Sequence, residues 1–324
     1  MINISIIVCC YNSQNVIIET LKHLANQRTD HRFEHEIVLV DNNCSDETVI
    51  SARQFWDQLE ITTNLNIISE PTPGLSHARK KGVNRSKGDL VVFCDDDNWL
   101  QEDYLSIAYD FMQEHPEVGG LGGQSIGVLE SAAPEWWDMK KTSYAVGEQS
   151  IHSGDVSTRG YLWGAGLVIR KEILLNLEKV KYRSLLSDRK GEQLNSGGDS
   201  EMCKWILLMN YKLWYLKELK FYHFITANRL EDTYLEKLFE GHSKAQPILN
   251  LYDRFIVYVK GNEGIRSSIL QDFQIFKKGV KYFYEKDTRW KEYIQLALGS
   301  RFKFYPDLFM IIRTYQKIKN FSLK

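Results

Sequence analysis

A repeated order of apolar and polar segments in the first hundred residues constrains the fold of this chain most strongly. Short apolar runs rich in β-branched residues occupy positions 4–8, 36–40 and 90–93, and each is followed by a polar cluster and then by a helix-compatible segment. In the segment 15–27, apolar residues recur along one helix face. Short continuous strands joined by helices are typical of a parallel sheet with both faces covered. The sequence therefore predicts an α/β fold in which helices flank a mostly parallel sheet.

Further patterns extend this prediction along the chain. Residues 66–69 and 162–169 are expected to form strands, and residues 199–209 are expected to form a helix. Near the end, Tyr, Phe and Lys alternate through 273–284 and 308–318, which favours amphipathic helices.

The length and the change of pattern indicate two parts. The chain has 324 residues, which exceeds one typical domain. Because the pattern becomes helical near residue 231, we expect an α/β domain over 1–230, with halves 1–125 and 126–230, followed by a helical region over 231–324.

The overall charge excludes one class of partner. Lys and Arg number 41 against 42 Asp and Glu, which gives no reason to expect nucleic-acid binding. The charge is uneven, since residues 251–324 contain 15 basic and 7 acidic side chains. Two interpretations of this segment stay open: a helical cap that completes the core, or a basic platform for peripheral contact with an anionic membrane.

Cysteine usage and hydropathy bear on location. The five cysteines form no CxxC pair, which argues against a disulfide framework or a zinc site. The apolar run at 4–10 lacks a basic leader and a cleavage site, and no stretch approaches the roughly 18 apolar residues of a spanning helix. We therefore expect a cytoplasmic protein, with peripheral contact at the inner face of the cell membrane left open.

Three consecutive carboxylates, Asp95, Asp96 and Asp97, end the apolar run at 90–93. Like charges so close raise one another's pKa, and a divalent cation relieves that cost. Mg²⁺ and Mn²⁺ prefer oxygen ligands, usually one or two carboxylates with phosphate oxygens completing the shell. The alternative is a solvated turn or a helix N-terminus, where Asp is common.

Four segments, taken in order, resemble the family 2 glycosyltransferases of the GT-A fold, whose sheet is Rossmann-like. They are Ile6-Ile7-Val8-Cys9-Cys10-Tyr11-Asn12, the stretch 36–48 with Asp41-Asn42-Asn43, Gly74-Leu75-Ser76-His77-Ala78-Arg79, and Asp95-Asp96-Asp97. The paired cysteines depart from the family's usual Pro or Thr before Tyr-Asn.

The resemblance implies a nucleotide-binding half at 1–125. Cys10, Tyr11 and Asn12 would form the nucleotide loop. Asp41 would contact the base, with uracil favoured, and Arg79 would reach the base or the diphosphate. Asp95 or Asp96 would lie near the ribose, and Asp97 would hold Mn²⁺ or Mg²⁺.

The same resemblance continues into an acceptor-binding and catalytic half at 126–230. Gly197-Gly198-Asp199 looks like the family's GED-type element, with Gly198 in place of the usual Glu. Asp199 would then be the general base of an inverting transfer, which needs a carboxylate to remove the acceptor proton. The alternative for Asp199 is a helix N-cap. His223 would be a metal or diphosphate ligand and Arg229 a diphosphate ligand, unless they are a structural histidine and a surface ion-pair partner.

Aromatic residues and glycines indicate where an acceptor would bind. Trp137, Trp163 and Gly164 lie where the family recognises acceptors, and aromatic faces suit the apolar surfaces of sugars. Packing in the core is the alternative for each tryptophan. The expected activity is therefore transfer of a sugar from a nucleotide-diphosphate donor, with UDP favoured, to a hydroxyl of a glycan or lipid-linked acceptor.

Two other functions stay open at this point. A sugar-nucleotide nucleotidyltransferase would also use a metal-bound diphosphate beside an α/β sheet, although no Gly-rich phosphate loop follows the first apolar run. A catalytically degenerate carbohydrate-binding protein would explain Gly198, although Asp97 and Asp199 are both present.

Overall fold

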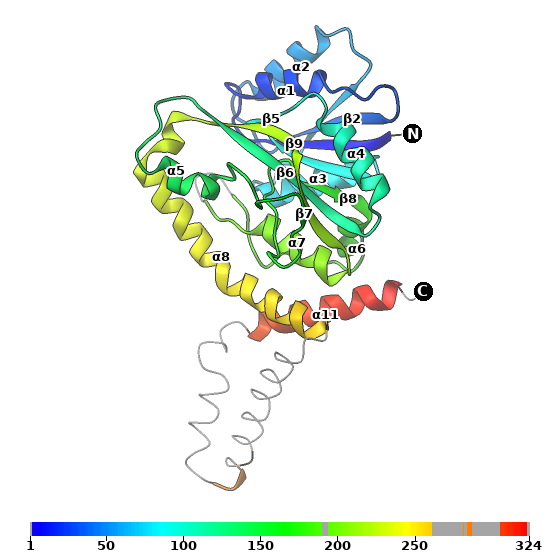
Figure 1. Ribbon diagram of the computed structural model, residues 1–324, viewed down its shortest axis with the longest axis vertical. Coiled ribbons are helices and arrows are strands. Elements are labelled where there is room, and N and C mark those ends of the chain that lie inside the picture. Colours follow the sequence, from blue (N-terminus) through cyan, green and yellow to red (C-terminus); the bar gives the residue numbers. More distant parts are fainter. Residues whose placement is uncertain (1, 190–193, 261–280, 282–283, 287–304, 323–324) are drawn as a thin grey trace. The chain divides into compact units, whose positions relative to one another are not determined.

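The structure is a computed structural model, and it describes residues 2–189, 194–260, 281, 284–286 and 305–322. The chain divides into two compact units, residues 1–245 and 246–324. The first unit contains a nine-stranded sheet with helices packed on it (Figure 1). The helical pattern expected from residue 231 begins with α8 (Asp232–Val259), and the boundary between the units falls within that helix.

Four parallel strands form the first half of the sheet and follow the order β3, β2, β1, β4. The apolar runs predicted as strands all lie within them. Cys10 pairs with Asp41, and Cys9 pairs with Asp95, so the carboxyl ends of the central strands are level. The polar loops that follow these ends therefore meet at one edge of the sheet. The strands are β1 (Ile2–Cys10), β2 (Glu34–Asp41), β3 (Asn64–Ser69) and β4 (Leu90–Asp95).

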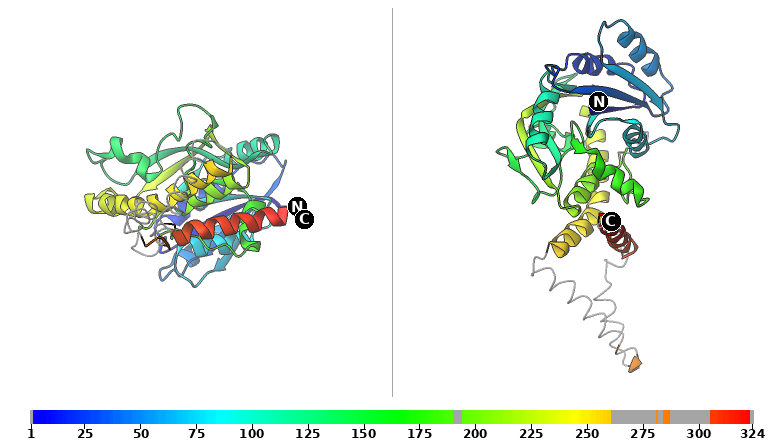
Figure 2. Two further views of the ribbon diagram at one scale, coloured as in Figure 1. Left: turned by 90° about the horizontal axis from the view of Figure 1, so that it is seen from below. Right: turned by 90° about the vertical axis from the view of Figure 1, so that its right-hand side faces the viewer.

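Helices cover both faces of these strands because side chains alternate along each strand. On one face, Ile6 and Val8 belong to the same core cluster as Leu21 of α1. On the other face, Ile7 and Val40 lie against Gly82 of α3. The right-hand view of Figure 2 shows α1 and α2 above the strands and α3 below them. The helices concerned are α1 (Ile17–Ala25), α2 (Thr48–Asp57) and α4 (Tyr104–Glu114) on the first face, and α3 (Leu75–Arg85) on the second.

The second half of the sheet is mixed. Strand β8 is antiparallel to both β4 and β6, whereas β6 and β9 are parallel to each other. The short strands β5 and β7 are both antiparallel to β9. The prediction of a parallel sheet thus describes the first half, and the antiparallel pairings extend it. The strands are β5 (Asn98–Leu100), β6 (Val118–Leu129), β7 (Gly154–Asp155), β8 (Val168–Arg170) and β9 (Lys212–Ile225).

The strand predicted at 162–169 is wrong over most of its length, because β8 begins only at Val168. The first amides of this segment bond to side chains, and only the carbonyl of Leu167, directly before β8, accepts a backbone amide of β4, that of Phe93 at 2.9 Å. The amide of Leu162 donates to Sγ of Cys203 at 3.3 Å, and the amide of Trp163 donates to Oε1 of Gln149 at 2.9 Å. Side-chain acceptors therefore satisfy these amides without a sheet ladder.

The remaining helices belong to both units. The helix predicted at 199–209 is α7 (Gly198–Leu208), and the pattern at 308–318 lies within α11 (Tyr305–Ser322). In the second unit, the rings of Phe255 and Tyr315 pack edge to face at 5.4 Å. The predicted helix at 273–284 falls almost wholly outside the described residues. The other short helices are α5 (Trp137–Lys140), η1 (Lys141–Tyr144), α6 (Lys171–Lys179) and η2 (Ala227–Leu230).

Among the described residues, no helix has the combination of length and apolar character that crossing a bilayer requires. The proposed membrane-facing segment, 251–324, lies largely outside the described residues, so its role stays a prediction.

The close approach of β6 and β9 at Gly123 can be tested by substitution. A Cβ on Gly123 would lie 1.9 Å from the carbonyl oxygen of Leu219, where the register between the strands shifts. We expect Gly123→Ala to lower the free energy of unfolding by about 3 kcal/mol, because the backbone must move to relieve the clash. Chemical denaturation measures this. The control is Gly154→Ala, whose Cβ would meet nothing within 4 Å. Equal stability of the two variants would contradict the described packing.

Candidate active site

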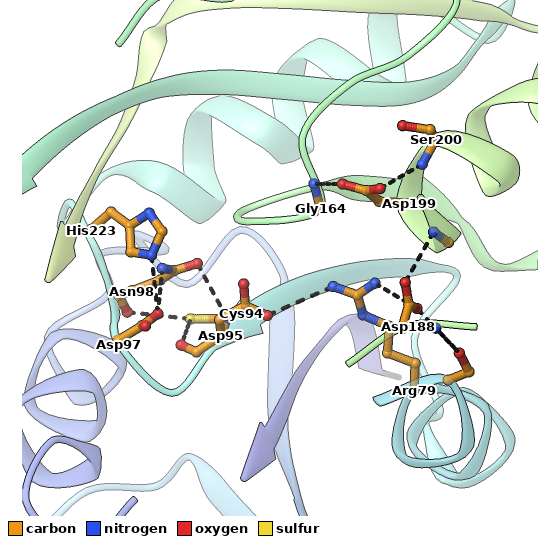
Figure 3. Close-up of polar contacts among 12 residues, drawn as sticks. Arg79, Cys94, Asp95, Asp97, Asn98, Gly164, Asp188, Asp199, Ser200 and His223 are labelled. Carbon is orange, nitrogen blue, oxygen red and sulfur yellow. Dashed lines mark hydrogen bonds and ion pairs between the residues drawn. The ribbon is translucent and has the colours of Figure 1, made fainter. Parts of the chain in front are cut away.

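Asp97, at the turn after β4, is held by a cation and an imidazole from distant parts of the chain. Its Oδ2 pairs with Nη1 of Arg229 at 2.5 Å, and its Oδ1 lies 3.5 Å from Nε2 of His223. Asn98 also donates its side-chain amide to Oδ1 of Asp97 at 3.0 Å. All four side chains are largely buried. Figure 3 shows His223 and Asn98 beside Asp97.

Strand pairing explains this meeting. Asn98 of β5 pairs with His223 of β9, and the amide of Phe224 donates to the carbonyl of Asp97 at 2.9 Å. Alternation along β9 then turns His223 inward while Tyr222 and Phe224 are less buried. The pairing brings together the predicted metal ligands Asp97 and His223, together with Arg229.

The neighbouring carboxylates differ in charge state. Burial favours the neutral form of Asp97, but the charges of His223 and Arg229 outweigh it and hold the pKa of Asp97 well below its usual range. Asp96 faces the other way and accepts a hydrogen bond from the hydroxyl of Ser13. Burial, and then the charge of Asp97, raise the pKa of Asp96 to about 7. The turn thus holds one firmly ionised carboxylate beside one that protonates easily.

Arg79 is a buried cation on α3, with 7% of the residue exposed. Its Nη2 lies 3.7 Å from Oδ1 of Asp95, and its Nη1 lies 3.6 Å from Oδ2 of Asp188. The guanidinium stands over the ring of Phe93 at 5.2 Å. Burial lowers the pKa of Arg79, but Asp188, Asp95 and then Asp199 outweigh this effect and raise it. Arg79 therefore stays charged and links the end of β4 to the segment before α7.

Asp199, in the first turn of α7, points toward the same region. Its Oδ2 accepts the amide of Gly164 at 2.9 Å, and its Oδ1 accepts the amide of Ser200 at 2.7 Å. A Cβ on Gly164 would lie 2.9 Å from Nη2 of Arg79 and 3.0 Å from Cβ of Asp199. Gly164 therefore lies between the cation that reaches Asp95 and the predicted base. Figure 3 shows both sets of contacts in one view.

The predicted nucleotide loop splits into buried and exposed parts. Cys10 is 1% exposed and belongs to the core, whereas Tyr11 is 48% exposed. Asn12 adopts a left-handed backbone with φ 54°, and its side-chain oxygen accepts the amide of Ser45 at 2.8 Å. Asp41 accepts the amide of Cys44 at 2.9 Å. The Asn12 contact joins the loops after β1 and β2. The buried side chain of Cys10 is not available to a ligand, whereas Tyr11 is exposed.

Asn42 organises the next loop, a role that the sequence did not reveal. Its side chain donates to the carbonyls of Glu70 and Thr72, at 2.9 and 2.7 Å, and accepts the amide of Gly74 at 2.8 Å. Gly74 has φ 132° and precedes α3, the helix that carries Arg79. The only sequence signal was the place of Asn42 in the polar cluster after β2.

The tryptophans predicted to bind an acceptor are largely buried. Trp137 is 7% exposed and packs with Tyr144 in a cluster under α8. Trp163 is 8% exposed, and Arg159 stands over its ring at 5.6 Å. Gln149 holds the backbone of Trp163, and nothing in the sequence pattern singled it out. Acceptor contact by Trp137, Trp163 and Gly164 stays a prediction.

Asp188 is a third contributor, after Asn42 and Gln149, that sequence reasoning missed. It precedes Arg189 and Lys190 in a polar stretch that looks like an ordinary surface loop. Its side chain is nevertheless only 10% exposed, and burial raises its pKa despite the opposing effect of Arg79. The burial of Asp188 can be recognised only from the three-dimensional structure, because it results from contacts with α3 and α7.

The donor set for a cation is small. Among the described residues, no group of three or more His, Cys, Asp or Glu side chains could hold a metal ion. Asp97 and His223 supply a carboxylate oxygen and an imidazole nitrogen close together, while Asp95 faces Arg79. This arrangement suits a cation that takes the rest of its ligands from a diphosphate.

Comparison with known proteins identifies the family. The sequence model described as Glycosyl transferase family 2 matches residues 5–174. The chain therefore belongs to glycosyl transferase family 2. It is 27% identical over 143 residues to poly(ribitol-phosphate) beta-N-acetylglucosaminyltransferase TarS of Staphylococcus aureus, covering 42% of this chain and 24% of TarS. It is 31% identical over 113 residues to glycosyltransferase AglE of Haloferax volcanii, covering 32% of this chain and 35% of AglE. The chain thus matches only a quarter to a third of the length of these relatives.

Solved structures confirm the GT-A type fold predicted from the sequence. Residues 1–349 of S. aureus TarS superpose with a TM-score of 0.54 and 18% identity, over 98% of this chain and 89% of that one. The same fragment in complex with UDP-GlcNAc gives a TM-score of 0.51 at 21% identity, over 69% and 58% of the two chains. GalNAc-T7 with UDP, GalNAc and Mn²⁺ gives 0.51 at 14% identity, over 69% and 44%.

The three hydrogen bonds of Asn42 lead to a stability prediction. We expect Asn42→Ala to lower the free energy of unfolding by about 3 kcal/mol, because buried backbone groups lose their partners. Urea denaturation followed by circular dichroism measures the change. Asn66→Ala, at an exposed position of β3, is the control and should alter stability by less than about 0.5 kcal/mol. A loss at Asn42 no larger than at Asn66 contradicts the assigned role.

Proposed function

We propose that this protein transfers a sugar from a UDP-sugar donor to a hydroxyl group of a glycan or lipid-linked acceptor, with inversion at the anomeric carbon. One observation carries the proposal. Gly164 separates the predicted base Asp199 from the guanidinium of Arg79, which in turn reaches Asp95 at the acidic end of β4. A carboxylate for the acceptor and a binding region for the donor therefore adjoin each other.

The nucleotide would occupy the loops at the carboxyl ends of β1, β2 and β4. Tyr11 and Asn12 are exposed there, and Asp41 pairs with Cys10, the residue directly before them. Arg79 and Arg229 supply positive charge toward the diphosphate. The fold-level neighbour TarS binds UDP-GlcNAc, which supports uracil as the base.

A divalent cation, Mn²⁺ or Mg²⁺, fits the donor atoms at Asp97. The carboxylate is held in its ionised form, and Nε2 of His223 stands close to one of its oxygens. These two residues would hold the ion, with Asp95 or Asp96 near the ribose. When bound, such an ion neutralises negative charge that develops on the leaving diphosphate. The Mn²⁺ of the neighbour GalNAc-T7 supports this choice.

Asp199 would act as the general base in a single displacement. The acceptor oxygen forms a bond to the anomeric carbon while the bond from that carbon to the diphosphate oxygen breaks. The acceptor proton passes to the carboxylate of Asp199, and the electron pair of the broken bond stays on the diphosphate. The amides of Gly164 and Ser200 hold Asp199 in a fixed orientation, which favours attack opposite the leaving group.

The acceptor would approach beside Gly164, whose missing side chain lets Arg79 and Asp199 lie close on either side of it. Trp163 directly precedes Gly164 in the same segment, and the ring of Trp137 packs against that of Tyr144 at 5.4 Å. A lipid-linked acceptor is consistent with peripheral membrane contact through 251–324, a segment that contains 15 basic and 7 acidic residues. In this proposal residues 1–125 bind the donor, residues 126–230 bind the acceptor and supply the base, and 231–324 is accessory.

Replacement of the proposed base tests the mechanism. We expect Asp199→Asn to lower kcat for sugar transfer, or for donor hydrolysis without an acceptor, by at least about 100-fold, since the amide cannot take a proton. UDP binding, measured by calorimetry, should stay within about twofold of wild type.

The matched control is Asp155→Asn. Asp155 is exposed and, like Asp199, accepts a nearby backbone amide, that of Ser157 at 2.8 Å. It should leave kcat unchanged. If Asp199→Asn turns over sugar nucleotides as fast as this control, Asp199 is not the base. If wild type turns over none of a panel of UDP-sugars, the degenerate binding protein replaces the proposed enzyme.

Cation dependence gives a separate test of the donor site. A saturating ligand that binds only the folded state stabilises it by mass action, so UDP with Mn²⁺ should raise Tm by about 5 °C. We expect Asp97→Asn to abolish the difference between Mn²⁺ and EDTA. Asp110→Asn, which also removes a partner of an arginine, is the control and should retain that difference. Retention of it in Asp97→Asn would exclude Asp97 as a ligand.

A further inference from the structure

Position 198 lacks a side chain because another residue fills the space. A Cβ on Gly198 would lie 2.3 Å from both carboxylate oxygens of Asp188 and 2.5 Å from its Cγ. Such distances are impossible for real atoms, so any side chain at 198 would displace Asp188. The backbone of Gly198 does not require glycine, because the left-handed φ of 105° belongs to Gly197. Space alone accounts for Gly198.

The carboxylate of Asp188 makes contacts in two directions. Its Oδ1 accepts the amide of Gly198 at 2.9 Å, in the first turn of α7. Its Oδ2 lies 3.6 Å from Nη1 of Arg79 and accepts the hydroxyl of Ser76 at 3.2 Å, both on α3. Asp188 therefore joins the helix that carries the proposed base to the helix that carries the proposed donor arginine (Figure 3).

These contacts suit a role for Asp188 in which its carboxylate stands in for a side chain that position 198 lacks. The family-type element has a Glu where this chain has Gly198, directly before the proposed base. We propose that Asp188 is a positioning residue whose carboxylate replaces that of the absent Glu, holding Arg79 and the start of α7 in their working arrangement. This inference rests on the proposed function for its kinetic consequences, while its structural part stands on the contacts alone.

The replacement also accounts for the charge balance. Arg79 is buried and faces Asp95 on one side, so a second carboxylate on the other side fixes the guanidinium between them. A Glu at 198 in the present chain would place a further negative charge, and its Cβ, onto Asp188. The two carboxylates are therefore alternatives: either position can carry one, but both cannot.

A double-mutant cycle tests this exclusivity. Asp188→Ala should lower kcat/KM for donor hydrolysis with Mn²⁺ by about 100-fold, because Arg79 and Asp199 lose their alignment. Gly198→Glu alone should lower it by at least as much, through the clash with Asp188. The double variant, Asp188→Ala with Gly198→Glu, should recover to within about tenfold of wild type, since one carboxylate again faces Arg79. Gly154→Ala, where a Cβ meets open space, is the control and should match wild type.

The kinetic measurements distinguish a role of Asp188 in positioning Arg79 and Asp199 from a role in stabilising the fold. If Asp188 served only to stabilise the fold, Asp188→Ala would lower Tm but keep wild-type kcat/KM at a temperature where circular dichroism shows a folded chain. That outcome overturns the proposal. A double variant whose kcat/KM equals the product of the two single losses, or falls below it, also overturns it.

The same cycle measured by Tm, without any ligand, keeps the two proposals distinguishable. If wild type hydrolyses no UDP-sugar, the proposed function fails, but the Tm values still report on Asp188. We expect the double variant to melt at a higher temperature than Gly198→Glu, because the clash is gone. Equal or lower Tm of the double variant would show that Asp188 and residue 198 do not compete for one space.

Discussion

Burial of the Arg79 guanidinium is the constraint on which the site depends. An isolated buried cation is costly, and two carboxylates together with an aromatic face offset that cost here. Reciprocally, Asp188, Asp95 and Asp199 all lie close enough to Arg79 to raise its pKa, and Arg79 lowers the pKa of Asp188 against the effects of burial and of Asp199. One positive charge therefore holds together acidic groups from β4, from the segment before α7 and from α7 itself.

The sheet provides the frame for this arrangement. Parallel strands of equal register bring the loops after β1, β2 and β4 to one edge, and the antiparallel pair β5–β9 adds His223 beside Asp97. The two halves of the first unit thus contribute different chemistry. Residues before 100 supply Arg79 and the carboxylates at the end of β4, and residues after 160 supply Gly164, Asp188, Asp199, His223 and Arg229.

Local sequence patterns predicted the parts of the structure that depend on local chemistry. The apolar runs became β1, β2 and β4 because a strand buried on both faces needs continuous apolar residues. The acidic turn after β4 was evident because three Asp residues follow such a run directly. The segment 162–167 was mistaken for a strand because the partners of its first three amides, Gln149, Asp199 and Cys203, are side chains far away in sequence. Asp188 and Asn42 escaped notice because their roles arise only from tertiary contacts. Gly198 stood out as a departure, but its cause lay ten residues earlier.

The late position of β9 has a consequence for how the protein is made. Strand β9 pairs with β6, β5 and β7, so it joins positions as far apart in the sequence as Asn98 and His223, and such long-range pairings form slowly. During synthesis the ribosome adds residues at about 5–20 per second, so β1 to β4 are exposed for several seconds before β9 emerges. Over that interval the acidic turn after β4 has neither His223 nor Arg229 beside it. The nascent chain thus carries an Asp97 whose partners, His223 and Arg229, arrive only with β9 and the short helix η2 that follows it.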